Sequence, residues 1–323
     1  MSLPPLDKTT GGESHQAGER SSHRAVLQKE LVEAVLGDPS GSYIDATFGR
    51  GGHARALLEQ LAPDARLLVI DRDLAAIHVA RALAEQDRRV SAVHAPFSEL
   101  AQVAAQENFS GVAGIMIDLG VSSPQLDEPD RGFSFRADGP LDMRMDQTQG
   151  MTAAEWLNKA DKQDMVRAFR EYGEERFAGR IAAAIVRARP LTTTAQLVAI
   201  IESAQPRPDK HKHSATRVFQ AIRIQINDEF EELRTVLSAA WDLLALNGQL
   251  AVLSFHSGED RIVKRHFAEL AQPDSLPRRL PVTESQRPPL RASVHKRRRA
   301  SESEISVNPR ARSVMLRAVG RLR

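Results

Sequence analysis

The sequence predicts an α/β fold, a mostly parallel sheet interrupted by an inserted all-helical domain. Four short apolar segments have the length and composition of buried strands, and helical patterns separate them. Strands that alternate with helices at this spacing form parallel sheets with right-handed crossovers. The four expected strands are residues 43–46, 66–71, 90–94 and 112–118.

Helices are expected before and between these strands. In residues 23–36, the apolar residues Leu27, Leu31 and Val35 recur at the spacing of one helix face. Glycine and proline follow at residues 37–41 and end this helix. Further helices are expected at residues 53–61, 74–83 and 97–105.

The alternation stops after the fourth strand. Residues 127–148 are loop-like, and residues 152–203 have a helical pattern without strands. Residues 216–244 have the spacing of one long amphipathic helix or of two closely joined helices, which Asn247-Gly248 closes. A strand at 250–255 and a helix at 262–270 return to the first pattern. The helical stretch is therefore expected to be an insert.

This pattern divides the chain into five expected parts. Residues 1–22 lack the apolar run of a signal peptide and are expected to be a disordered tail. The other parts are the first part of the α/β domain (23–126), the inserted helical domain (127–214), the second part of the α/β domain (215–270) and a basic C-terminal segment (271–323). No apolar stretch reaches membrane-spanning length, so a cytoplasmic protein without a membrane partner is expected.

The composition limits the class of protein. A chain of 323 residues suits two domains, or one domain with a large insert. Hydrophobic residues make up 41% and charged residues 27%, which is typical of globular proteins. The absence of cysteine excludes disulfide scaffolds and cysteine-ligated metal sites.

The charge is unevenly distributed. The whole chain has a formal net charge of +2, whereas residues 271–323 contain 13 Lys or Arg and 4 Asp or Glu. A basic end on an acidic remainder indicates a polyanionic partner, and RNA is favoured when an enzyme core lies beside it. The alternative is a solvated tail that aids solubility.

A glycine-rich turn with acids at a set distance indicates a ligand that contains ribose. The segment Asp45–His53 lies between a strand and a helix, and its glycines allow positive φ and close approach of a ligand. Asp71 and Asp73 end the next strand, 20 and 22 residues after Gly51, where a carboxylate can accept hydrogen bonds from both ribose hydroxyls. The glycine spacing is G-x-G-G, which disfavours a dinucleotide-binding enzyme.

A polar turn, Asp118–Gln125, follows the fourth strand and contains Ser122, Ser123 and Pro124. Such a turn suits the modification of an exocyclic amine, which is a poor nucleophile because its lone pair is delocalised into the ring. Carboxylate or carbonyl acceptors that bind its N–H groups would aim the lone pair at a methyl group. An ordinary strand-end turn explains these residues equally well.

Two further segments are candidates for substrate contact. After the strand at 250–255, Phe255 is a candidate for base stacking and His256 for proton transfer, while a helix start capped by Ser257 is the bland alternative. The loop Arg131–Asp146 combines aromatic residues with arginines, which suits stacking on nucleotides and contact with phosphates. Packing of this loop against the protein is the competing explanation.

Together these segments resemble the bacterial 16S ribosomal RNA (cytosine-N4)-methyltransferase family, also called the MraW or ribosomal RNA small subunit methyltransferase H family. The resemblance covers about residues 23–318, and the order and spacing of the segments make it specific. The segments that carry it are Asp45–His53, Ile70–Asp73, Asp118–Leu126, Arg131–Asp146, Tyr172–Glu175, Ala215–Asn227, Ser254–Lys264 and Asn308–Ser313.

The resemblance implies a Rossmann-like class I methyltransferase fold whose helical insert recognises the substrate. It implies methyl transfer from S-adenosylmethionine to N4 of one cytidine in the decoding region of 16S rRNA, either on free RNA or on the small ribosomal subunit. Because a sulfonium is already a good leaving group, no metal is expected. The oligomeric state stays open, with a homodimer among the expectations.

By matched position, the resemblance also implies site residues. Asp73 fits the ribose role, and Phe97 fits a position beside the adenine. The expected cofactor contacts are Gly51, Gly52, His53, Asp73, Phe97, Asp118 and Gln125. The expected catalytic residues are Asp118, Ser122, Ser123, Pro124 and His256.

Two positions depart from the family pattern. Gly258 stands where leucine is usual, which bears on the stiffness of the chain after His256. Residues 25–28 are Ala-Val-Leu-Gln where the family usually has Pro-Val-Leu-Leu. Neither departure touches an expected cofactor position.

Three other functions are weighed against this one. A DNA or protein amino-methyltransferase would use the same fold, and a non-catalytic RNA-binding or assembly factor would keep the fold without the reaction. The intact Asp73, Asp118 and Ser122–Pro124 argue against lost catalysis. A dehydrogenase is disfavoured by the glycine spacing.

Overall fold

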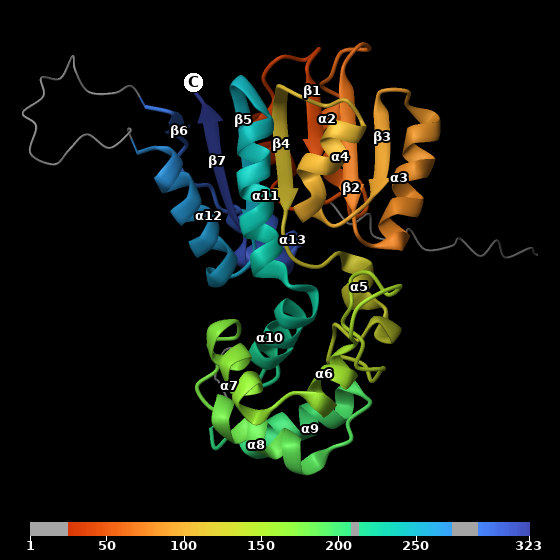
Figure 1. Cartoon of the computed structure of the whole chain (residues 1–323), viewed down its shortest axis with the longest axis vertical. Coiled ribbons are helices and arrows are strands. Elements are labelled where there is room, and N and C mark those ends of the chain that lie inside the picture. Colours follow the sequence, from red (N-terminus) through yellow and green to blue (C-terminus); the bar gives the residue numbers. More distant parts are fainter. Residues whose placement is uncertain (1–24, 208–212, 273–289) are drawn as a thin grey trace, which may run out of the picture.

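The computed structural model describes residues 25–207, 213–272 and 290–323. In these residues a seven-stranded sheet carries helices on both faces, and a layer of helices lies below one end of the strands (Figure 1). The expected tail, residues 1–22, lies outside the described residues. The strands are β1 (Ser42–Asp45), β2 (Arg66–Asp71), β3 (Val90–His94), β4 (Val112–Asp118), β5 (Leu244–Ser254), β6 (Ala292–Val294) and β7 (Met315–Arg321).

The sheet order is β3-β2-β1-β4-β5-β7-β6. Strands β1 to β5 pair in parallel, while β7 runs antiparallel to β5 and β6 antiparallel to β7. The predicted Rossmann-like class I methyltransferase fold is therefore confirmed. Since the parallel strands share one direction, the residues that follow them meet at one edge of the sheet.

Each central strand is buried on both faces. In β2, Leu68 and Ile70 belong to one hydrophobic core, and Leu67 and Val69 belong to the core on the opposite face. Burial on both faces explains why β2 is a continuous apolar run. The first core is covered by α4 (Leu100–Gln106), α11 (Glu229–Leu243) and α12 (Ser257–Leu270), and the second by α1 (Gln28–Val35), α2 (Gly52–Leu58) and α3 (Leu74–Gln86).

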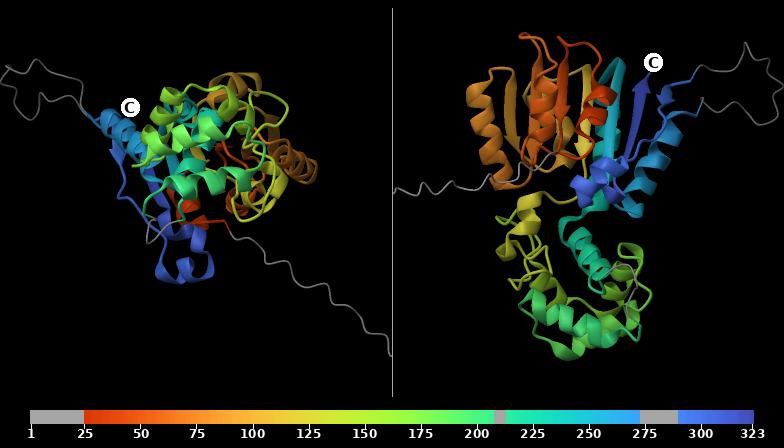
Figure 2. Two further views of the ribbon diagram at one scale, coloured as in Figure 1. Left: turned by 90° about the horizontal axis from the view of Figure 1, so that it is seen from below. Right: turned by 180° about the vertical axis from the view of Figure 1, so that it is seen from behind.

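The helical layer has its own core below the carboxyl ends of the parallel strands (Figures 1 and 2). Phe169, Ile181 and Ile222 are fully buried in it. Within the described residues, the main helices of this layer are α6 (Ala153–Lys159), α7 (Lys162–Glu171), α8 (Ala178–Ala188), α9 (Thr194–Ala204) and α10 (Thr216–Asn227).

Helix α10 follows residue 214, the expected end of the inserted helical domain, but packs with the helical layer. Its Val218, Phe219 and Ile222 lie in the core of the helical layer, so this layer continues to the end of α10. Asp228, with φ of 52°, then separates α10 from α11. The pattern at 216–244 is thus two joined helices, because one residue in a left-handed conformation redirects the chain.

The end of this segment also differs from the expectation. Strand β5 already begins at Leu244, so Asn247-Gly248 lies inside the strand and does not close the helix. The register between β4 and β5 shifts between Val112 and Gly114, and Asn247 has φ of 64°. A local irregularity in the strand therefore accommodates a dipeptide that is typical of turns.

In the basic C-terminal segment, residues 290–323 belong to the fold of the sheet. Strand β7 lies between β5 and β6, and its Leu316 and Val319 are buried. Arg317 of the same strand forms an ion pair with Asp260 of α12, at 2.7 Å. Between β6 and β7 lie α13 (Glu302–Val307) and the short 3-10 helix η4 (Pro309–Ser313). No helix within the described ranges is long and apolar enough to span a membrane.

Deleting residues 272–323 is therefore expected to unfold the protein. The deletion would remove β7 and with it Met315, Leu316 and Val319, which are all buried. Each such side chain contributes about 1.5–3 kcal/mol on burial, and the loss approaches the total stability of a typical domain. Circular dichroism and gel filtration should show loss of the cooperative melting transition. A truncated chain that melts at the temperature of the full chain would contradict this role of β7.

Candidate functional site

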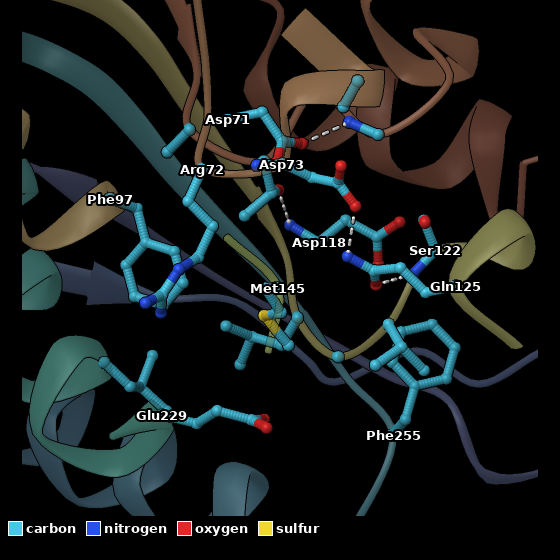
Figure 3. A pocket seen from close by; sticks show the side chains of 18 of the residues that line it. Asp71, Arg72, Asp73, Phe97, Asp118, Ser122, Gln125, Met145, Glu229 and Phe255 are labelled. Atoms are coloured by element: carbon cyan, nitrogen blue, oxygen red, sulfur yellow. Dashed lines mark hydrogen bonds between the residues drawn. The ribbon is translucent and has the colours of Figure 1, made fainter. Parts of the chain in front are cut away.

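A cavity lies at the carboxyl edge of the sheet, between the sheet and the helical layer (Figure 3). It has about 880 Å³ of empty space, part of it open to solvent. Of the predicted site residues, Asp73, Phe97, Asp118, Ser122 and Gln125 line this cavity.

The glycine-rich turn forms the wall after β1. Gly49 lines the cavity with φ of 56°, and a Cβ built on it would meet nothing within 4 Å. The predicted Gly51 and Gly52 do not line the cavity. A Cβ on Gly51 would lie 2.5 Å from the Phe48 ring, and one on Gly52 would lie 2.8 Å from Cβ of Ala25. These two glycines therefore permit the close packing of the turn, and Gly49 presents the open backbone.

The acids at the end of β2 have different surroundings. The Asp71 carboxylate accepts N–H groups from Gly49 at 2.7 Å and from Asp73 at 2.8 Å. Burial raises the pKa of Asp71 to about 6, although these N–H groups oppose the shift. Both residues line the cavity, but the hydrogen-bond acceptors of Asp71 are used by backbone donors alone.

Asp73 is engaged by side chains from two other segments. Its Oδ1 accepts the N–H of Ala75 at 2.9 Å and so caps α3. Its Oδ2 accepts Nε2 of Gln125 at 2.7 Å and Nη1 of Arg131 at 2.9 Å. Asp73, the residue predicted to bind the ribose, therefore also links α3, α5 and the loop that contains Arg131. The carboxylate of Asp71 has fewer hydrogen-bond partners than that of Asp73.

Asp118 connects the cavity to buried titratable groups. Nε2 of His53 lies 3.4 Å from Oδ2 of Asp118, and the His53 side chain is behind the cavity surface. Burial lowers the pKa of His53, but the carboxylates of Asp118 and Asp45 raise it further, so the net pKa lies above the ordinary value. Burial raises the pKa of Asp45 to about 7. His53 is therefore placed to hold Asp118, and it does not line the cavity.

The predicted polar turn begins the short helix α5 (Ser123–Asp127). Ser122 is its N-cap residue, and the Ser122 N–H donates to Oε1 of Gln125 at 2.9 Å. Ser123 and Pro124 do not line the cavity. Proline is well suited to this place because the first turn of a helix has no intrahelical partner for its N–H groups.

His256, the residue predicted to transfer a proton, lies at the start of α12. It is the N-cap residue of α12, and its ring lies against Glu259 with Nε2 at 2.8 Å from Oε1. Glu259 and Phe255 line the cavity, whereas His256 does not. Oε2 of Glu259 also accepts the N–H of Phe255 at 2.8 Å. His256 is thus placed to orient Glu259 and the backbone of Phe255.

Glu229 is a cavity residue that the sequence analysis missed. Figure 3 shows it on the opposite side of the cavity from Asp71. Arg223 donates to it through two hydrogen bonds of 2.7 Å and also lies 3.6 Å from Glu259. In the sequence, Glu229 looks like an ordinary acid in the first turn of a helix. Glu229 reaches the cavity because α11 begins at this residue, directly after the break at Asp228.

The aromatic residues of the loop Arg131–Asp146 pack against the protein, which corrects the expectation of exposed aromatics, although residues 136–138 of the loop are exposed. Phe133 and Met143 lie buried in the core of the helical layer. Arg131 is buried, and besides its bond to Asp73 it donates to the Met145 carbonyl at 2.9 Å. The buried Asn227 accepts the Met145 N–H and donates to the Met143 carbonyl, both at 2.8 Å. These bonds hold Met145 on the cavity wall.

The environment of Gly258 explains the departure at this position. A Cβ built on Gly258 would lie 2.5 Å from the Phe230 ring. Phe230 packs edge-on against Tyr172, with ring centroids 5.3 Å apart. A leucine at 258 would therefore need the space that Phe230 fills in this chain.

Comparisons with known proteins show the family of the chain. The model of the MraW methylase family matches residues 20–322. Three relatives carry the name ribosomal RNA small subunit methyltransferase H. The relative from Idiomarina loihiensis is 52% identical over 93% of this chain and 97% of its own length. Those from Chromohalobacter salexigens and Methylobacillus flagellatus are each 49% identical, over 99% and 97% of this chain and 97% and 98% of their own lengths. The chain therefore belongs to the MraW methylase family.

Proposed function

We propose that the protein transfers a methyl group from S-adenosylmethionine to N4 of one cytidine in the decoding region of 16S rRNA. The observation that carries this proposal is the cavity at the sheet edge, where Asp71, Asp73 and Phe97 face the Asp118–Gln125 turn. The names of the relatives support rRNA of the small subunit as the substrate. With this substrate we expect a cytoplasmic protein, and we include a homodimer in the proposal.

The cavity residues fit the cofactor, which supplies a methyl group activated on a sulfonium. Asp71 and Asp73 offer carboxylate oxygens to the ribose hydroxyls, and Phe97 offers a ring to the adenine. Gln125 holds Asp73 in place. Gly51, Gly52 and His53 act from behind the surface, by shaping the turn and holding Asp118.

The acceptor amine is proposed to meet Asp118 and the turn that follows it. Asp118 offers a carboxylate to the N–H groups of the amine, and Phe255 offers a ring on which a base can stack. Ser122, Ser123 and Pro124 hold the backbone of the turn as the start of α5. His256 contributes through Glu259.

The direct test is methyl transfer from labelled S-adenosylmethionine to small ribosomal subunits from cells that lack this gene. N4-methylcytidine at one position of 16S rRNA is the expected product. Free 16S rRNA in a parallel reaction shows which form is the substrate. Cofactor binding without transfer to either form would contradict the proposal and favour DNA or protein as the substrate. A chain that binds no cofactor would instead behave as an assembly factor.

Asp71→Asn is expected to weaken cofactor binding and to remove its dependence on pH. Because the pKa of Asp71 is about 6, its carboxylate is protonated below this pH and ionised above it. An ionised acceptor contributes about 1.5–3 kcal/mol per hydrogen bond, so affinity should rise by about tenfold or more as the pH passes upward through this value. Calorimetry at several pH values checks this, and an unchanged pH profile in the variant would exclude Asp71 as the ribose acid.

Asp73→Ala should weaken cofactor binding and also destabilise the protein. The substitution leaves the buried Arg131 without its carboxylate, a change that costs about 3–5 kcal/mol for a buried pair. Calorimetry and thermal melting of the same sample separate the two effects. An unaltered melting temperature would show that the Asp73–Arg131 pair does not hold the site.

The exposed cations after β6 are proposed to contact RNA phosphates. Lys296, Arg297 and Arg299 are exposed, whereas Arg298 pairs with Glu33 at 2.9 Å. Replacing the three exposed cations by alanine should weaken RNA binding and lower the slope of log affinity against log salt by about 0.7–0.9 for each lost phosphate contact. The fold should persist, unlike that of the truncated chain. An unchanged salt slope would place the RNA contacts elsewhere.

A further inference from the structure

The segment Asn308–Ser313 carries part of the family resemblance but lines no part of the cavity. It forms η4 and lies against α5, although about 185 residues separate the two in the chain. Asn308 caps η4 by accepting the N–H of Arg310 at 3.1 Å, and Ala311 is buried. A second anchor lies nearby, since Glu304 accepts the N–H of Leu27 at 2.7 Å. The backbone that carries Arg310 is therefore fixed.

The Arg310 guanidinium spans α5. One of its nitrogens donates to Oγ of Ser123 and another donates to Oδ1 of Asp127 at 2.7 Å. Ser123 and Asp127 are the first and last residues of α5, so one side chain holds both ends of this helix. Only the planar fork of arginine presents two such donors in a set geometry.

Helix α5 needs this support because it has five residues. A helix of this length is not stable by itself. Its N-cap Ser122 and its Gln125 line the cavity, and Gln125 also binds Asp73. The orientation of α5 therefore sets the place of two cavity residues and of the carboxylate that Gln125 holds.

We propose that Arg310 is a positioning residue for methyl transfer, which holds α5 from outside and so fixes Ser122 and Gln125 in the cavity wall. The inference rests on the proposed function for its activity readout. Because the Arg310 and Asp127 side chains are 36% and 48% exposed, their ion pair contributes little to global stability. Arg310 keeps α5 ordered. Its replacement should therefore lower kcat and leave the melting temperature unchanged.

The test compares Arg310→Ala, Arg310→Lys and Arg312→Ala in the full chain. Arg312 is the matched control, because it is an exposed arginine of the same short helix and makes no described contact with α5. In Arg310→Ala, kcat for transfer to small subunits should fall about ten- to hundredfold, since small misplacements at a reacting centre have effects of this size. The kcat of Arg310→Lys should lie between those of Arg310→Ala and the unaltered protein. Arg312→Ala should keep the kcat of the unaltered protein.

Hydrogen exchange gives a readout that does not depend on activity. Amides of residues 119–128 should exchange faster in Arg310→Ala than in Arg312→Ala, while both variants keep the melting temperature of the unaltered protein. Asp127→Asn should act in the same direction and more weakly, because it changes only one of the two bonds that Arg310 makes to α5.

Two results would overturn the inference. One is unchanged kcat and unchanged exchange in Arg310→Ala. The other is a raised KM for RNA with unchanged kcat and a reduced salt dependence, which would make Arg310 a phosphate contact. If the unaltered protein methylates no RNA, the proposed function fails, and the exchange rates still decide whether Arg310 orders α5.

Discussion

The site depends on the interactions of one buried carboxylate, that of Asp73. It caps α3, binds Gln125 of α5 and pairs with Arg131 of the loop that enters the helical layer. A buried ion pair adds little net stability, but loss of one partner is strongly unfavourable because the other charge stays buried. The end of β2, the Asp118–Gln125 turn and the helical layer are therefore held in one relative arrangement, and this arrangement makes the cavity.

The same principle operates at the other chain crossing between the layers. Asn227 ends α10 and binds the backbone of Met143 and Met145, while Arg72 donates to the Asn227 carbonyl at 3.0 Å. Arg223 adds a buried pair with Glu229. Both crossings are thus closed by hydrogen bonds between buried polar groups, which specify one geometry where apolar contacts alone would allow several.

The sequence predicted elements whose signal is local. The bounds of β2, β3 and β4 were predicted to the residue, because each is an apolar run bounded by polar turns. Strand β7 was missed because Arg317 and Arg321 interrupt its buried residues inside a basic stretch. In the site, the rule that ligands bind at the strand ends placed Asp73, Phe97, Asp118 and Gln125 at the cavity. It could not show that His53 and His256 turn toward Asp118 and Glu259, since side-chain direction depends on packing between distant segments.

The cavity and the outer surface differ in charge, and this difference suits the two substrates of the proposed reaction, S-adenosylmethionine and RNA. Glu229 and Asp73 are neutralised by arginines, whereas Asp71 has no Lys or Arg ion-pair partner in the part of the chain that the structure describes. Asp71 therefore leaves negative charge in the cavity, which favours a cationic sulfonium and disfavours phosphate, while the Asp118 carboxylate faces His53 at 3.4 Å. The exposed cations at 296–299 lie outside the cavity and favour binding of phosphate groups. A nucleotide would therefore enter base first, with its phosphates held at the surface, and this is the orientation that presents an exocyclic amine to Asp118.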